Sequence, residues 1–129
     1  MIVADTSAAV AALLGQSSAR EALIGQRLIA PHVIDAEVAH ALRGLVRGSK
    51  LSADQGRSLL GTWCRLALDR LPMAPLLPRV WELRDNLTAY DAVFVAAAEA
   101  HGVPLVTGDR GIATAVGPRC RIELIARPA

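Results

Sequence analysis

Two acids frame a helix-turn-strand unit near the end of the chain. Thr88 precedes a predicted helix over 89–100 and is followed three residues later by Asp91, a spacing typical of a helix N-terminus. A glycine turn leads into a short apolar strand over 105–107, which stops just before Asp109. A helix that feeds a parallel strand runs antiparallel to it, so the helix begins where the strand ends. We therefore expect both acids at the carboxyl edge of a sheet, where such folds build their sites.

Two more acids are expected at the same edge. Asp5 directly follows the apolar run 2–4 and directly precedes an Ala/Leu-rich helix. Glu37 lies in the second turn of a predicted helix over 32–46, which follows a short strand over 28–30. Because a helix that follows a parallel strand starts at the carboxyl edge, Glu37 and Asp5 should lie near the first two acids.

A cluster of carboxylates favours a hard divalent cation. Carboxylates crowded at one edge repel one another, and their pKa values rise unless a cation lies between them. Mg²⁺ or Mn²⁺ suits oxygen-only ligands, and these ions serve phosphoryl chemistry. Taken singly, each acid also has a structural interpretation. Asp5, Asp91 and Asp109 could cap helices, each contributing about 0.5 to 2 kcal/mol, and Glu37 could be a solvated helix residue.

The other predicted elements complete an alternating α/β pattern. With 129 residues the chain is expected to form one domain over 1–129. A loop or short helix should follow Asp109. The remaining helices are predicted over 19–24, 52–69 and 78–87, and the remaining strands over 71–76, at an edge, and 121–125.

Composition narrows the classes of function. The formal net charge is +2, and without the four clustered acids the rest of the surface is distinctly basic. Aromatic residues make up 3%, too few for base stacking to dominate nucleic-acid recognition. The hydrophobic fraction of 53% favours a large interface with a partner or a second copy. No apolar run reaches the ~20 residues of a membrane span, and the N-terminal stretch lacks the basic start of a signal peptide, so we expect a cytoplasmic protein.

Rival acidic sites fit the spacing less well. A haloacid-dehalogenase-type phosphatase needs a second Asp two residues after the first, where Ser7 stands. A phosphate-receiver domain needs a paired acid near the first strand and a late Lys, whereas the only lysine is Lys50. A di-iron bundle needs two Glu-x-x-His motifs, and Glu37-x-x-His40 supplies one. The two cysteines lack the spacing of a zinc site.

The arrangement resembles the PIN-domain nucleases and, within them, the VapC-type toxins of bacterial toxin–antitoxin pairs. The stretches IVADTSA, PHVIDAEVAHAL and YDAVFVAAAEAHGVPLVTGD carry the resemblance, which covers essentially the whole chain. It implies a PIN-like three-layer α/β/α sandwich with a mainly parallel central sheet of about four to five strands. By position, the family's catalytic and metal-holding acids are Asp5, Glu37, Asp91 and Asp109, with Thr6 and Thr107 as supporting residues.

The same resemblance implies a Mg²⁺-dependent endoribonuclease, with Mn²⁺ as a possible substitute, in which a metal-activated water attacks the RNA phosphodiester. It implies a structured cellular RNA as substrate, tRNA or rRNA. It also implies a homodimer and a cognate VapB-like antitoxin held in an apolar groove, with the helices over 6–14, 19–24 and 32–46 as walls. No membrane partner is expected. The candidates for phosphate contacts are Arg43, Arg47, Lys50 and Arg110.

Alternatives remain open at this stage. One is a catalytically inactive PIN-like module that binds RNA or protein, and another is an acid-dependent phosphatase acting on small molecules. Asp35, two residues before Glu37, is expected to point away from the acid cluster. The sequence leaves open which RNA is cleaved, whether one or two metal ions bind, and which antitoxin is the partner.

Overall fold

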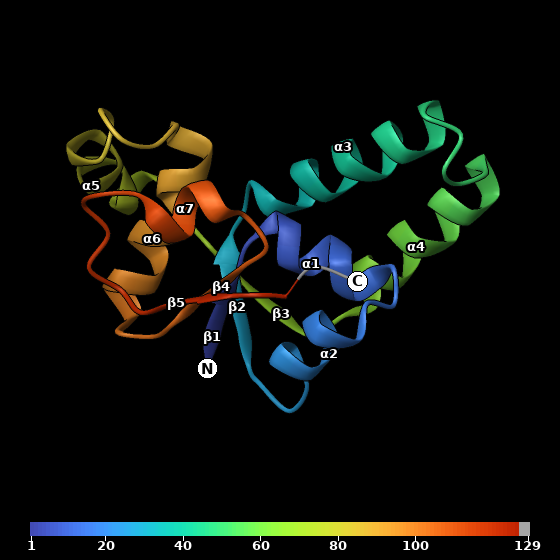
Figure 1. Ribbon diagram of the computed structural model, residues 1–129, viewed down its shortest axis with the longest axis horizontal. Helices are drawn as coiled ribbons and strands as arrows, with labels where there is room; N and C mark the ends of the chain where they lie inside the picture. Colours follow the sequence, from blue (N-terminus) through green and yellow to red (C-terminus); the bar gives the residue numbers. More distant parts are fainter. Residues whose placement is uncertain (127–129) are drawn as a thin grey trace.

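The computed structural model describes residues 1–126 and has a parallel sheet at its centre (Figure 1). The sheet has five strands in the order β3-β2-β1-β4-β5, and each neighbouring pair is parallel. β1 occupies the middle, so the residue that follows it lies at the centre of the carboxyl edge. The strands are β1 (Ile2–Ala4), β2 (Leu28–Pro31), β3 (Leu68–Leu71), β4 (Leu105–Thr107) and β5 (Ile122–Leu124).

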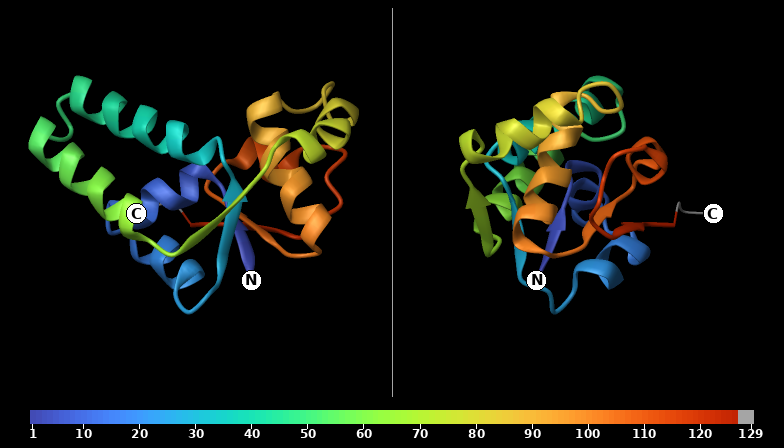
Figure 2. Two further views of the ribbon diagram at one scale, coloured as in Figure 1. Left: turned by 180° about the vertical axis from the view of Figure 1, so that it is seen from behind. Right: turned by 90° about the vertical axis from the view of Figure 1, so that its left-hand side faces the viewer.

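Helices cover both faces of the sheet, which confirms the predicted PIN-like α/β/α sandwich (Figures 1 and 2). One face carries α1 (Thr6–Leu13), α2 (Ser17–Leu23), α3 (Ile34–Arg47) and α4 (Ala53–Arg65). The other carries the short 3₁₀ helix η1 (Ala74–Leu76), α5 (Leu77–Glu82), α6 (Ala89–His101) and α7 (Arg110–Thr114). Within residues 1–126, no helix is long and apolar enough to cross a membrane.

The central helix α6 forms because its sequence has clear start and stop signals. The Thr88 hydroxyl accepts a hydrogen bond from the Asp91 N–H at 3.2 Å, and Gly102 ends the helix in the left-handed region at φ 62°. Every residue from Ala92 to Ala98 is buried. Small alanine side chains let the helix pack against β1 and β2, so the position of Asp91 in its first turn is fixed by the core.

Two predicted boundaries are wrong in the same region. α4 ends at Arg65 rather than near Asp69, and β3 occupies 68–71 rather than 71–76. Leu68 to Leu71 pair in register with β2, whereas Pro72 and Pro75 lack the N–H groups that a strand needs. The predicted helix over 78–87 also stops early, since α5 ends at Glu82 and a turn follows.

Candidate functional site

The structure brings four carboxylates to the carboxyl edge of the sheet. Asp5 follows β1 and accepts the capping hydrogen bond of α1, and Asp109 follows the neighbouring β4 and caps α7. Glu37 lies in the first turn of α3 and Asp91 in the first turn of α6. Because strands and helices alternate in direction, all four side chains approach the same edge.

Asp5 is the most buried of the four, and its carboxylate is held in a fixed orientation. Oδ1 accepts hydrogen bonds from the Ser7 hydroxyl at 2.6 Å and the Ala8 N–H at 2.9 Å, while Oδ2 accepts one from the Thr107 hydroxyl. A carboxylate offers about four acceptor positions, so Oδ2 keeps one for a further ligand. Burial raises the pKa of Asp5, these hydrogen bonds lower it in part, and the charge of Asp109 raises it again.

Two hydroxyl groups join the loop after β1 to the turn after β4. Ser7 Oγ accepts a hydrogen bond from the Gly108 N–H at 2.8 Å while it donates to Asp5. Thr107 Oγ1 accepts from the Asp109 N–H at 2.9 Å while it donates to Asp5. Ser7 is a site residue that was not predicted from the sequence. Its position two residues after an acid at a helix start was the available signal, because such a hydroxyl can reach back to the carboxylate.

Glu37 and Asp91 share the electrostatic field of the other acids. Thr6 Oγ1 donates to Glu37 Oε1 at 2.9 Å. Burial raises the pKa of Glu37, the Thr6 hydrogen bond opposes this, the charges of Asp91 and Asp5 raise it further, and the charge of His40 lowers it. Burial also raises the pKa of Asp91, and the charge of Asp109 adds to the effect. The four acids therefore repel one another as a single group.

Among residues 1–126, no arginine or lysine pairs with this group of acids. None of the four forms an ion pair, in contrast to the acids Asp35, Asp69, Glu82, Glu99 and Glu123, which each pair with an arginine. The cost of holding unpaired carboxylates together indicates a site shaped for a positively charged ligand.

The ligand set fits a hydrated divalent cation rather than a closed metal cage. Within the described part of the chain, no three His, Cys, Asp or Glu side chains stand close enough to hold an ion together directly. Mg²⁺ usually keeps several water ligands and binds proteins through one or two carboxylates. The oxygen-only donors, with unused acceptor positions facing a common edge, are compatible with that mode of binding.

The predicted phosphate contacts fall into two places. Arg110 is exposed and starts α7, directly after Asp109. Arg43 and Arg47 are exposed on α3, and Lys50 is exposed just beyond its end. Across the described residues none of these four forms an ion pair. Arg110 therefore lies beside the acids, whereas the other three follow α3 away from them.

Asp35 points away from the four acids, as predicted, and has a structural role that the sequence did not reveal. Its carboxylate accepts two hydrogen bonds from Arg70, at 2.7 and 2.9 Å, and one from Trp63 Nε1 at 2.8 Å. Hydrogen bonding by Arg70 lowers the pKa of Asp35. The contact joins α3 to α4 and β3, which fixes the first turn of α3 and with it Glu37.

Comparison with known proteins identifies the family. A family model described as the PIN domain matches residues 2–117. Ribonuclease VapC9 of Mycobacterium tuberculosis is 46% identical over 127 residues, which cover 98% of this chain and 100% of that protein. Ribonuclease VapC1 of the same species is 43% identical over 95% of this chain and 96% of that protein.

Solved structures share the fold at low sequence identity. VapBC2 from Rickettsia felis, bound to a promoter DNA fragment, matches with a TM-score of 0.72 at 19% identity over 98% of this chain and 100% of that one. FitAcB from Neisseria gonorrhoeae matches with a TM-score of 0.70 at 18% identity over 95% and 96%. The chain therefore belongs to the PIN-domain family, among the VapC ribonucleases.

Proposed function

We propose that this chain is a Mg²⁺-dependent endoribonuclease and the toxin of a toxin–antitoxin pair. The observation that carries the proposal is the group of four unpaired carboxylates at the carboxyl edge of the sheet. Its relatives at 46% and 43% identity bear the name ribonuclease VapC, which supports the same reaction class. An inactive PIN-like binding module is the alternative, and it gives no reason to hold repelling acids together.

In this proposal Asp5 and Asp91 would hold the ion, and Glu37 and Asp109 would bind it through water or hold a second ion. When bound, Mg²⁺ lowers the pKa of a water and stabilises charge on the phosphate being cleaved. Thr107 keeps the Asp5 carboxylate in one orientation, and Thr6 does the same for Glu37. Arg110, beside Asp109, is the residue best placed to attract the RNA phosphate toward the acids.

The test is cleavage of total bacterial RNA by the purified protein with Mg²⁺ or Mn²⁺, beside EDTA and an Asp91→Asn variant. We expect discrete fragments with 5′-phosphates that disappear with EDTA and in the variant. Such fragments also identify the substrate, for which tRNA and rRNA are the candidates. RNA binding without cleavage supports the inactive module, and hydrolysis of nucleotides without RNA cleavage supports a phosphatase.

Metal binding should be visible as thermal stabilisation, independent of RNA. The raised pKa values of Asp5, Glu37 and Asp91 mean that their charged forms destabilise the folded chain. Their contribution to stability is full below the unfolded-state pKa and is lost as pH rises through the folded-state pKa. At neutral pH, Mg²⁺ or Mn²⁺ at tenfold over Kd should stabilise the chain by about 1.4 kcal/mol, or roughly 3–6 °C in Tm.

Differential scanning fluorimetry checks this expectation. Asp91→Asn should melt higher than the parent without metal, because repulsion is reduced, and should lose most of the metal-induced shift. Asp54→Asn is the matched control, since Asp54 is exposed on α4 and forms no ion pair within residues 1–126. Equal metal shifts in both variants would place the ion elsewhere.

An apolar groove between α1, α2 and α4 supports the antitoxin part of the proposal. It has a volume of about 390 Å³. The predicted walls over 6–14 and 19–24 line it, but α4 forms the third wall in place of most of α3. Ile34 is the only α3 residue in the lining, which includes Leu13, Leu23, Ile24, Trp63 and Leu66.

An apolar antitoxin segment is the proposed occupant of this groove. The structural neighbours include a toxin–antitoxin complex from Klebsiella pneumoniae, which matches with a TM-score of 0.61 at 15% identity. Ile24 is 78% exposed at the groove and is free to contact a partner. Coexpression with the adjacent small gene's product should yield a complex, and Ile24→Glu should weaken it about tenfold or more by losing apolar burial. Failure of the parent to form any complex would remove the antitoxin from the proposal.

A second copy of the chain is the proposed partner of exposed apolar side chains on α5 and α6. Leu77 and Trp81 on α5 are 52% and 68% exposed, and Tyr90 at the start of α6 is 64% exposed. Large apolar side chains left in water favour an interface. Because Tyr90 adjoins Asp91, a homodimer that buries Tyr90 would bring the two acid groups near the interface.

A further inference from the structure

Basic charge is concentrated on one projecting part of the molecule. The hairpin formed by α3 and α4 beyond Glu37, residues 38–65, carries a single acid, Asp54. The rest of residues 1–126 contains more acidic than basic side chains. The lysine and arginine residues of the hairpin are Arg43, Arg47, Lys50, Arg57 and Arg65.

These five basic side chains are exposed and lack acidic partners in the described structure. The arginines that do form ion pairs, Arg27, Arg70, Arg79 and Arg121, all lie outside the hairpin. Neighbouring unpaired cations repel one another, and an extended anionic partner would relieve this repulsion along the whole hairpin.

The hairpin is built as a stiff arm. It leaves the body of the molecule at the end where the acids lie and extends outward (Figures 1 and 2). Gly56 on α4 is buried against α3, where an added Cβ would lie 2.9 Å from Val46 Cγ2. Asp35, bonded to Trp63 and Arg70, fixes the base of the hairpin. Close packing along its length and a polar contact at its base hold the two helices as one unit.

The basic residues of the arm follow a line that starts at the acid group. At about 1.5 Å per helical residue, Arg43 lies about 9 Å and Arg47 about 15 Å along α3 from Glu37. A groove of about 450 Å³ between the two helices has Arg43, Arg47 and Arg57 in its lining. The only aromatic residue of the arm, Trp63, is buried. The arm therefore offers charge and shape rather than stacking surfaces.

We propose that the α3–α4 hairpin is an electrostatic arm that binds RNA phosphates remote from the bond being cleaved. The proposal rests on the ribonuclease function proposed above, and it assigns a role in substrate binding to a surface outside the acid group. The RNA must continue about 15 to 20 Å beyond the cleaved bond along α3, with its backbone against the arm. A short single strand that ends near the acids reaches only Arg110.

The experiment compares two RNAs that share one mapped cleavage site, a full-length folded substrate and a fragment of about three nucleotides, which is too short to reach Arg43 and Arg47. The arm variant is Arg43→Gln/Arg47→Gln, and the matched control is Arg84→Gln/Arg119→Gln. Both variants remove two exposed positive charges, but Arg84 and Arg119 lie outside the hairpin. KM, kcat and the salt dependence of binding are measured for each protein on each RNA.

We expect the arm variant to raise KM for the folded RNA about tenfold more than the control does, with kcat retained. The slope of log K against log salt should fall by about 2, since each arginine that no longer neutralises a phosphate lowers it by about one unit. On the short fragment, arm and control variants should behave alike. If both variants raise KM for the folded RNA equally, the proposed role of the arm in RNA binding is wrong.

Two other outcomes are distinguishable from that failure. If the arm variant loses affinity for an antitoxin and none for folded RNA, the arm binds an acidic protein segment and the proposal is wrong. If the parent cleaves neither RNA, the ribonuclease function fails. The contribution of the arm to RNA binding can then still be measured without cleavage. Filter binding of the folded RNA is compared between Asp91→Asn and the same variant with Arg43→Gln/Arg47→Gln added.

Discussion

Asp5→Asn is expected to reduce RNA cleavage about 10³-fold, equivalent to about 4 kcal/mol of transition-state stabilisation. Asp5 stands at the end of the central strand and has an acceptor position available on Oδ2. The substitution removes the negative charge nearest the centre of the acid group, which is the charge that the proposed ion needs. Single-turnover cleavage of the mapped RNA measures the effect without interference from product release.

The variant should remain folded, because the amide can replace the structural hydrogen bonds of the acid. Its oxygen can still accept from the Ala8 N–H and cap α1. Its NH₂ group can donate to Thr107 Oγ1, which can then donate to Ser7 Oγ, 3.4 Å away. We therefore expect a Tm at or above that of the parent when no metal is present, since one repelling charge has been removed.

Ser7→Ala is the companion variant, because it removes a hydrogen bond to Asp5 and leaves the charge. Cleavage should fall about tenfold or more, since a hydrogen bond to a charged carboxylate contributes about 1.5 kcal/mol or more. Cleavage by Asp5→Asn within tenfold of the parent would contradict a role for Asp5 in the chemistry. A variant that loses both cleavage and its thermal transition would be uninformative alone, and Ser7→Ala then carries the test.

The positions of the acids could be predicted because they depend on local signals and on the handedness of α/β connections. Asp5 follows an apolar strand, and Thr88 with Gly102 marks the limits of the helix that bears Asp91. The regular alternation of strands and helices then places the carboxyl edge. These signals lie within a few residues of each acid, so no knowledge of long-range contacts is required.

The contacts around Asp35 could not be predicted, because they depend on where β3 lies. The apolar residues of α4 continue at helical spacing through Leu66. This spacing predicts a helix to Asp69, longer than the one observed. Pairing with β2 ends that helix early and places Arg70 beside Asp35. The same error hid the contribution of α4 to the apolar groove. When a segment has a composition that suits either a helix face or an edge strand, its pairing with other strands decides which one forms, and the sequence pattern does not.

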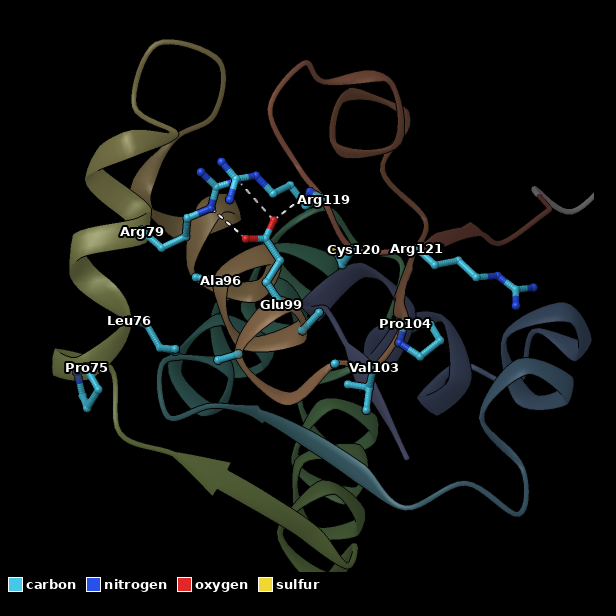
Figure 3. Close-up of a pocket in the computed structure, with 13 residues that line it drawn as sticks. Pro75, Leu76, Arg79, Ala96, Glu99, Val103, Pro104, Arg119, Cys120 and Arg121 are labelled. Carbon is cyan, nitrogen blue, oxygen red and sulfur yellow. Dashed lines mark hydrogen bonds and ion pairs between the residues drawn. The ribbon is translucent and has the colours of Figure 1, made fainter.

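Glu99→Gln is expected to lower the free energy of unfolding by about 2 to 3 kcal/mol at neutral pH. Glu99 points between two other segments, α5 and the chain before β5 (Figure 3). Its Oε1 accepts from Arg79 Nε at 2.7 Å, and its Oε2 accepts from the Arg119 N–H at 2.7 Å. The Glu99 and Arg79 side chains are only 15% and 20% exposed, so the substitution leaves Arg79 with the exposed Glu82 as its remaining ion-pair partner in the described structure.

The cost should depend on pH in a defined direction. Burial by itself raises the pKa of Glu99, but hydrogen bonds from Arg79 and Arg119 and their charges outweigh it, so the pKa is lowered. Stabilisation by this carboxylate is therefore complete above its unfolded-state pKa, about 4.3, and is lost as pH falls through the lower folded-state value. The difference between parent and Glu99→Gln in urea unfolding should stay constant from pH 7 to about pH 5 and shrink only below about pH 4.3.

Glu82→Gln is the matched control, because Glu82 pairs with the same arginine but is 62% exposed. An exposed pair of this kind contributes at most about 0.5 to 1 kcal/mol. If both substitutions cost the same, or if the cost at Glu99 persists at pH 3, altered packing rather than the missing charge explains the effect. The expected result would show that α6 uses its two acids oppositely. Glu99 is neutralised by arginine and holds the last turn of the helix, whereas Asp91 in the first turn forms no ion pair within residues 1–126.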